Sequence, residues 1–176
     1  KGDLPGAIAD YNKAIELDPR MWQAYSGRAH AHMAQGNLSG ALEDYDRVIK
    51  IDPRKAYAYT HRGSVLQAMG KLSGAIADYD RSVEIDPRVV STYVNRGNAR
   101  TDKGDLAGAI EDYNKAIELD PKSVSAYISR GAIYCDNVKD YDRAIIDFTQ
   151  AIKLDPKLVV AYKNRGIARS GKGDLA

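Results

Sequence analysis

The sequence predicts an all-α protein, a solenoid of helical hairpins that follow one another along the chain. The first observation is a dipeptide, Asp-Pro, whose prolines recur at spacings of 34, 34, 34 and 35 residues. The second is a tyrosine six residues after each of these prolines, and the third is a small residue four positions beyond each tyrosine. A period of this length is typical of repeat proteins, in which each unit buries its apolar face only against its neighbours. The prolines are Pro19, Pro53, Pro87, Pro121 and Pro156.

The half of each period that precedes the proline is predicted to be an amphipathic helix. In residues 7–17 the apolar side chains recur at the spacing that places them on one helix face. The Asp-Pro dipeptide ends this helix, because the residue before a proline is driven out of the α region. The apolar residues of this stripe are Ala7, Ile8, Tyr11, Ala14 and Ile15.

The other half of each period is predicted to be a helix that ends at a glycine. Residues 93–103 contain no proline, and Gly104 can end a helix in the left-handed conformation. Each period is therefore helix, glycine turn, helix, proline turn. The other glycines at this position are Gly2, Gly36, Gly70 and Gly173.

Small residues indicate where two helices of a hairpin approach closely. A glycine inside a helix costs about 0.5–1 kcal/mol relative to alanine, so its recurrence needs a packing reason. An aromatic residue of the second helix is expected to fill the space beside each crossing. The small residues are Ala29, Gly63, Gly97, Gly131 and Gly166, and the aromatics are Tyr11, Tyr45, Tyr79, Tyr113 and Phe148.

This pattern resembles the tetratricopeptide repeat, a helix-turn-helix of 34 residues. The resemblance implies a right-handed α-α superhelix that binds a protein or peptide partner and is not an enzyme. In one repeat the matching residues are Tyr93, Gly97, Gly104, Ala109, Tyr113, Ala116 and Pro121. The resemblance divides residues 1–176, a single array, into three parts. These are a second helix alone (1–21), full repeats (22–55, 56–89, 90–123, 124–158) and a first helix alone (159–176).

An arginine stands where the family usually has a leucine, three residues after each repeat tyrosine. An aspartate also precedes the aromatic residue of each second helix. Because buried charges need partners, we expect each arginine to make a charged hydrogen bond to a repeat aspartate. The alternative is that the arginines bind an acidic ligand. The two sets are Arg28, Arg62, Arg96, Arg130 and Arg165, and Asp10, Asp44, Asp78, Asp112 and Asp147.

One turn departs from the period. Residues 134–141 lack the turn glycine and contain one additional residue. Asn137 is the predicted left-handed residue of this turn, because asparagine tolerates that conformation best after glycine. The insertion is interpreted as tolerated drift rather than as a recognition element, since loops accept insertions readily.

The first helices of this family line a concave groove, which is where the resemblance places a peptide. The lining is mostly uncharged and hydrogen-bonding, and asparagine offers both a donor and an acceptor to an extended backbone. The family's lysine, asparagine and arginine clamp for a terminal carboxylate is matched only in part, and an asparagine ladder only with interruptions. Ordinary solvated residues are the remaining alternative. The predicted groove residues are His30, Tyr57, His61, Ser91, Asn95, Asn98, Thr101, Ser129, Lys163 and Asn164.

Composition excludes several other classes of function. A net charge of +2 does not call for nucleic acid, and no apolar run reaches the ~18–20 residues of a membrane span. His30 and His61 could face one another, but no third metal ligand accompanies them. Cys135 has no obvious base to activate it as a nucleophile. No catalytic residue, metal or other cofactor is therefore predicted. A cytoplasmic location is favoured over others.

The chain begins with a second helix and ends with a first helix, so each end is expected to have an apolar face without its partner. Leu4, Ala7 and Ile8 of one copy could then meet Tyr162 and Ala168 of another, head to tail. Alternatively, flanking protein covers these faces. The favoured function is a scaffold that binds a peptide in the groove. The alternatives are a self-assembling array and a regulatory module of a larger enzyme.

Overall fold

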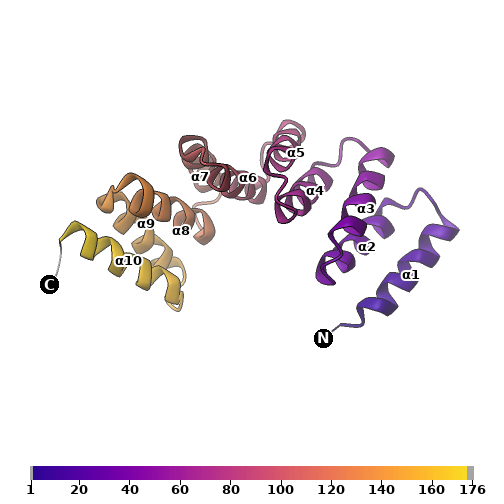
Figure 1. Ribbon diagram of the computed structural model, residues 1–176, viewed down its shortest axis with the longest axis horizontal. Helices are drawn as coiled ribbons and strands as arrows, with labels where there is room; N and C mark the ends of the chain where they lie inside the picture. Colours follow the sequence, from indigo (N-terminus) through magenta and orange to yellow (C-terminus); the bar gives the residue numbers. More distant parts are fainter. Residues whose placement is uncertain (1, 174–176) are drawn as a thin grey trace. The chain divides into compact units, whose positions relative to one another are not determined.

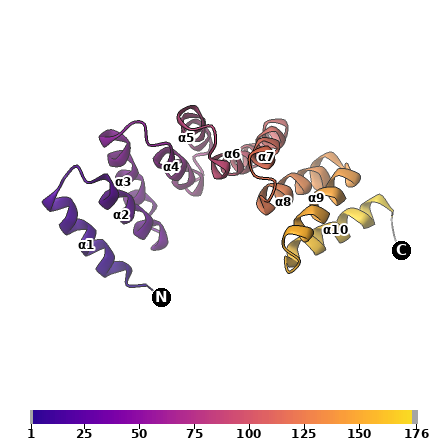
Figure 2. The same ribbon diagram turned by 180° about the vertical axis from the view of Figure 1, so that it is seen from behind.

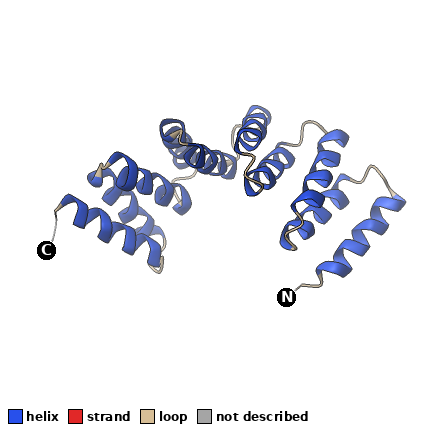
Figure 3. Cartoon of the chain, in the orientation of Figure 1, coloured by secondary structure: helices blue, strands red, loops and turns tan. Residues whose placement is uncertain are grey.

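The computed structural model describes residues 2–173, which contain ten α-helices and one short π-helix and no strand (Figures 1 and 3). This confirms the predicted all-α helical-repeat fold. The first residue and the last three of the predicted array lie outside the described residues. The elements are α1 (Leu4–Leu17), α2 (Trp22–Ala34), α3 (Leu38–Ile51), α4 (Ala56–Ala68), α5 (Leu72–Ile85), α6 (Val90–Lys103), α7 (Leu106–Leu119), α8 (Val124–Ile133), η1 (Tyr134–Val138), α9 (Tyr141–Leu154) and α10 (Val159–Lys172).

The helices form two compact units, residues 1–95 and residues 96–176, and the boundary falls within α6. In the first unit α2 packs against α3 and α4 against α5, while α1 lies against α2. In the second unit α8 packs against α9, which also contacts α10. Figure 2 shows the antiparallel hairpins of each unit from behind. Each hairpin is a first helix and a second helix in the order that the period predicts.

The Asp-Pro dipeptides end the second helices as predicted. The aspartate that follows each of these helices is extended, with ψ between 93° and 100°. Its carboxylate accepts a hydrogen bond from the backbone N–H two residues later, as Asp18 does from Arg20 at 2.9 Å. Tyrosines of the following helices donate to the proline carbonyls of four turns, as Tyr93 does to Pro87 at 3.1 Å. At these turns the aspartate, the proline and the tyrosine together fix the backbone.

The glycine turns are left-handed at four of the five predicted positions, with φ between 73° and 91° at Gly36, Gly70, Gly104 and Gly173. The fifth, Gly2, follows no helix among the described residues. A side chain at these φ values would be strained, so the turns depend on glycine.

The turn without glycine differs from the prediction. Lys139, not Asn137, takes the left-handed conformation, with φ of 59° and ψ of 25°. The additional residue is absorbed by the π-helical turn η1, which extends the helix to Val138 and so moves its end beyond Asn137. The backbone N–H groups of Lys139 and Asp140 both donate to the Tyr134 carbonyl. The prediction of Asn137 was wrong because residue preference was weighed without this widened turn.

Close crossings form where the small residues are. The aromatic side chains of α3, α5, α7 and α9 are at most 1% exposed. A Cβ atom added to Gly97 would lie 2.7 Å from a ring carbon of Tyr113, which confirms that the glycine is needed for the ring to pack. The alanine that opens each of these second helices is fully buried at the same crossing, as Ala109 is in α7.

The predicted arginine–aspartate pairs are present in all four complete hairpins. Arg62 donates to both carboxylate oxygens of Asp78, at 2.7 and 2.6 Å, and its third contact, at 2.6 Å, is Asp46 on the preceding second helix. These bonds raise the pKa of the Arg62 guanidinium above its ordinary value, so it is charged. Each arginine therefore pairs with the second helix of its own repeat. The other pairs are Arg28–Asp44, Arg96–Asp112 and Arg130–Asp147.

The fifth arginine makes the backward hydrogen bond without a forward one among residues 2–173. Arg165 donates to Thr149 Oγ1 at 3.2 Å, the position that corresponds to Asp46 for Arg62. No second helix follows α10 among the described residues, so no repeat aspartate reaches it. The prediction that every arginine pairs with a repeat aspartate is thus confirmed for four and not for Arg165.

Removing one partner of a pair should destabilise the fold. The side chain of Asp112 is 3% exposed and accepts bonds from Arg96 and Arg100, so Asp112→Ala removes the buried carboxylate that the two guanidinium groups share. We expect a loss of about 3 kcal/mol in the free energy of unfolding, measured by urea titration. Lys115→Ala, which breaks an exposed pair with Glu118, is the control and should cost less than about 1 kcal/mol. Equal losses in the two variants would contradict a structural role for the arginine–aspartate pairs.

Candidate functional site

In the first unit, three of the predicted groove residues form an aromatic cluster on α2 and α4. The rings of His30 and His61 lie 4.8 Å apart between centroids and meet edge to face. Tyr57 lies 6.1 Å from His61, and Trp22 lies 5.7 Å from Tyr57. The two histidines therefore face one another as predicted, and the cluster continues across two successive first helices.

A buried tyrosine underlies this cluster. Tyr45 of α3 stacks on His61, with an interplanar angle of 13°, and His30 meets its ring edge on. The hydroxyls of Tyr45 and Tyr57 are buried and have no hydrogen-bond partner in the part of the chain that the structure describes. Tyr79, one repeat later, donates instead to Ser64 and Gln67. Tyr45 lacks these partners because His30 and Met33 occupy the equivalent positions.

The surroundings of the two histidines differ. His30 Nδ1 donates a hydrogen bond to the Ser26 carbonyl at 2.8 Å. Burial lowers the pKa of His61, and the neighbouring His30 lowers it further. His61 is therefore neutral near neutral pH.

Asn95 and Ser91 complete the predicted residues of the first unit. Asn95 donates to Ser64 Oγ at 3.4 Å, which connects the beginning of α6 to α4. Ser64 in turn accepts from the hydroxyl of Tyr79 and donates to the Thr60 carbonyl. Ser91 is exposed on α6. Asn95 thus belongs to a hydrogen-bond network, whereas Ser91 is open to solvent.

In the second unit, three of the predicted residues line one cavity of about 290 Å³. Asn98 Oδ1 accepts from the hydroxyl of Tyr113 at 2.8 Å and from Ser129 at 3.4 Å. Thr101 lies 3.4 Å from the same tyrosine hydroxyl. The wall also includes Ile133 and residues of η1, so both polar and apolar side chains line the cavity.

The last two predicted residues, Lys163 and Asn164, line an adjoining cavity of about 140 Å³. Its other walls include Ile167 and Cys135, and it shares Ala132 and Asp136 with the first cavity. The structure therefore brings the five predicted residues of the second unit into two neighbouring cavities. Sequence reasoning missed the contribution of η1, which exists because of the inserted residue.

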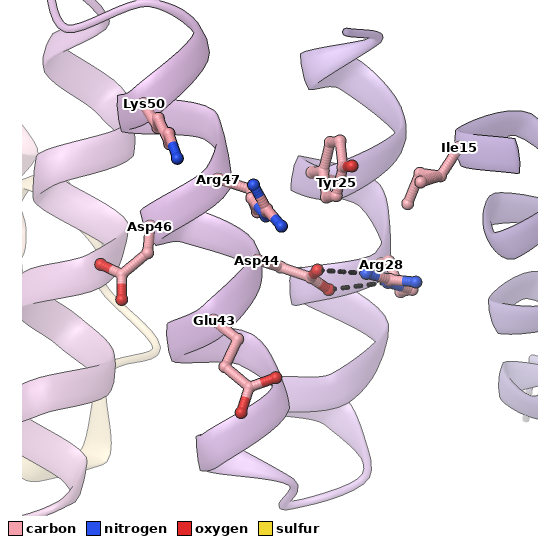
Figure 4. A pocket seen from close by; sticks show the side chains of 8 residues that line it. All are labelled: Ile15, Tyr25, Arg28, Glu43, Asp44, Asp46, Arg47 and Lys50. Carbon is pink, nitrogen blue, oxygen red and sulfur yellow. Dashed lines mark hydrogen bonds and ion pairs between the residues drawn. The ribbon is translucent and has the colours of Figure 1, made fainter. Parts of the chain in front are cut away.

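A further cavity of about 620 Å³ lies away from the predicted residues, among α1, α2 and α3 of the first unit (Figure 4). It surrounds the Arg28–Asp44 pair. Its six charged residues balance in number. The repeat pattern of the sequence predicted the Arg28–Asp44 pair but not the cavity around it. The lining is Ile15, Tyr25, Arg28, Glu43, Asp44, Asp46, Arg47 and Lys50.

Within residues 2–173, no group of three or more histidine, cysteine or acidic side chains could hold a metal ion, and no helix is long and apolar enough to cross a membrane. Burial raises the pKa of the Cys135 thiol, and Asp136 raises it further. A nucleophilic cysteine needs the opposite shift.

The hairpins, their proline turns and the polar first helices define a helical-repeat protein. The "TPR repeat" family matches residues 1–36, 29–70 and 97–137, and the "Tetratricopeptide repeat" family matches residues 56–89 and 124–158. The chain belongs to the tetratricopeptide repeat family.

Solved structures of other proteins share the fold. A crystal structure of MamA is 27% identical, with a TM-score of 0.81 over 89% of this chain and 91% of that one. YrrB, described as a TPR protein with an unusual peptide-binding site, is 21% identical, with a TM-score of 0.76 over 93% and 84%. The first TPR of Spaghetti (RPAP3), bound to the HSP90 peptide SRMEEVD, is 24% identical, with a TM-score of 0.66 over 69% and 96%. No curated protein matches this chain.

The environment of His61 predicts how stability depends on pH. Because the pKa of His61 is lower in the folded protein than in the unfolded chain, the unfolded chain binds the proton more readily. Stability should therefore fall as the pH drops below about 6.5, the unfolded value. His61→Gln should lose less stability than the parent chain between about pH 7.5 and 5.5, measured by urea titration. An equal loss in both chains would contradict this assignment.

Proposed function

We propose that the protein is an interaction scaffold that binds an extended peptide segment of a partner protein along its first helices. The observation that carries the proposal is the clustering of hydrogen-bonding side chains in the two adjoining cavities of the second unit. Asn98, Thr101 and Ser129 line one, and Lys163 and Asn164 line the other. These residues come from three successive first helices.

The chemistry of this lining suits a peptide backbone. The amide of Asn164 offers a donor and an acceptor together, which matches the alternating N–H and C=O groups of an extended chain. Ile133 and Ile167 supply apolar wall beside the polar groups. A pocket that combines apolar contact with a few directed hydrogen bonds is the usual form of a binding site.

The charge of the lining favours an internal segment over a terminal carboxylate. Lys163 is the positively charged residue that lines the two cavities, and two acidic residues, Asp102 and Asp136, more than offset its charge. A carboxylate is best held by two or more donors of positive charge, such as the fork of an arginine. The repeat arginines do not supply these, since their guanidinium groups are committed to aspartates in the complete hairpins.

Proteins of the same fold supply further support. YrrB is described by its peptide-binding site, and the first TPR of RPAP3 is bound to an HSP90 peptide. At 21% and 24% identity these proteins show that the fold can hold a peptide, and the side chains of this chain determine which one.

A peptide library displayed on phage would test the proposal. Peptides selected on the intact chain would be synthesised, and their affinities measured by fluorescence anisotropy. Asn98→Ala with Asn164→Ala should weaken binding at least about fivefold, because each lost hydrogen bond contributes roughly 1 kcal/mol.

The matched control is Gln150→Ala, which removes an amide from α9 outside both cavities and should leave the affinity unchanged. Thermal unfolding followed by circular dichroism would verify that both variants are folded. Selected peptides that bind the double variant as tightly as the parent chain would refute binding in these cavities.

A further inference from the structure

The second helices α1, α5 and α7 each carry an exposed ion pair near their carboxyl ends. A basic residue donates to a glutamate three positions later, so the two charges neutralise one another on the surface of the helix. The pair occupies the same two positions in each of these helices, which makes it part of the repeat pattern. The pairs are Lys13–Glu16, Arg81–Glu84 and Lys115–Glu118, with N···O distances of 2.8, 2.8 and 2.6 Å.

The helix α3 departs from this pattern, because Lys50 stands where those three helices have glutamate. The basic position is kept as Arg47, so two positive charges lie one turn apart. Neither side chain makes a hydrogen bond or an ion pair with any residue that the structure describes. Like charges at neighbouring positions destabilise a helix about as much as opposite charges stabilise it, so the stability of α3 does not explain the exchange.

Both of these cations line the cavity of about 620 Å³ among α1, α2 and α3. In Figure 4 the side chains of Arg47 and Lys50 point into the space beside the ring of Tyr25. The side chains of Glu43 and Asp46 point away from this space. The positive charge of the lining is therefore gathered at one part of the cavity.

Most of the other charged residues of the lining are already paired. Arg28 donates to both carboxylate oxygens of Asp44, at 2.9 and 2.5 Å. Asp46 is bound by Arg62 of the next first helix, at 2.6 Å. Glu43 is exposed and has no ion pair with a described residue. Although the charges of the lining balance in number, two cations and one carboxylate thus remain to act on a ligand, which favours an anion.

We propose that this cavity binds a phosphomonoester group carried on an apolar stem. The planar guanidinium of Arg47 holds two phosphate oxygens, and the ammonium group of Lys50 holds the third. Two cations match the charge of roughly −1.5 to −2 that a phosphomonoester has near neutral pH, whereas a carboxylate has half of it. Ile15 and the ring of Tyr25 supply apolar wall for the stem.

The phosphate belongs either to a phosphorylated side chain of a partner protein or to a small organic phosphate. The lining of this cavity shares no residue with the two cavities of the second unit. The site is therefore independent of the peptide binding proposed above, and either proposal can fail without the other.

A titration of the intact chain with phenyl phosphate, followed by ¹H–¹⁵N NMR, tests the site. The signals of Arg47, Lys50 and Tyr25 should shift and saturate. Benzoate, which carries a single negative charge on the same ring, should bind at least about fivefold more weakly. The absence of a saturable shift up to about 10 mM phenyl phosphate, or benzoate that binds as tightly, would overturn the proposal.

A charge reversal that restores the repeat pattern separates binding from folding. Lys50→Glu should weaken phenyl phosphate binding at least about tenfold, because the new carboxylate neutralises Arg47 and repels the phosphate. Its thermal unfolding midpoint should be unchanged or raised, since α3 then gains the ion pair of the other helices. The matched control is Lys153→Glu, which makes the same change at the equivalent position of α9, outside the cavity.

Lys153→Glu should bind phenyl phosphate as the parent chain does. An affinity that Lys50→Glu leaves unchanged, or an equal loss in both variants, would overturn the assignment to this cavity.

A short peptide distinguishes the two sources of the phosphate. Acetyl-glycyl-phosphotyrosyl-glycine amide carries the phenyl phosphate group on a peptide backbone. If the peptide binds at least as tightly as phenyl phosphate, the site accepts a phosphorylated side chain of a partner protein. If it binds less tightly or not at all, the site is one for small organic phosphates. Binding of neither probe would overturn the proposal.

Discussion

The charged hydrogen bonds between the repeat arginines and aspartates are the interaction on which this structure depends. In each complete hairpin the guanidinium of the first helix donates to the aspartate of its own second helix, as Arg130 does to Asp147. It can also reach the second helix of the repeat before, as Arg130 does at Asn114. One side chain thereby joins three helices. Charge is held inside the array only because both oxygens of each carboxylate are satisfied, and breaking such a pair costs far more than the pair is worth at a surface.

This arrangement leaves the opposite side of the first helices free for recognition. The arginine–aspartate pairs hold the hairpins together. The residues that line the cavities, such as Asn98 and Asn164, vary from repeat to repeat. The two units accordingly have different linings. The first is an aromatic cluster around His61 that includes the buried hydroxyls of Tyr45 and Tyr57, and the second is a pair of cavities with polar lining. A scaffold built this way can change its partner without changing its fold, because fold and lining use different side chains.

The sequence by itself determined the period, the helix ends and the ion pairs, because these follow from local rules. A proline or a left-handed glycine acts within a few residues, and a charge repeated in register on two packed helices has one available partner. Only the tertiary structure decided the left-handed residue of the irregular turn, which is Lys139 because η1 widened the helix there. It also decided that His61 stacks on Tyr45, and that Asn98 and Asn164 lie in adjoining cavities. These contacts depend on how side chains of different helices pack together, which no local rule contains.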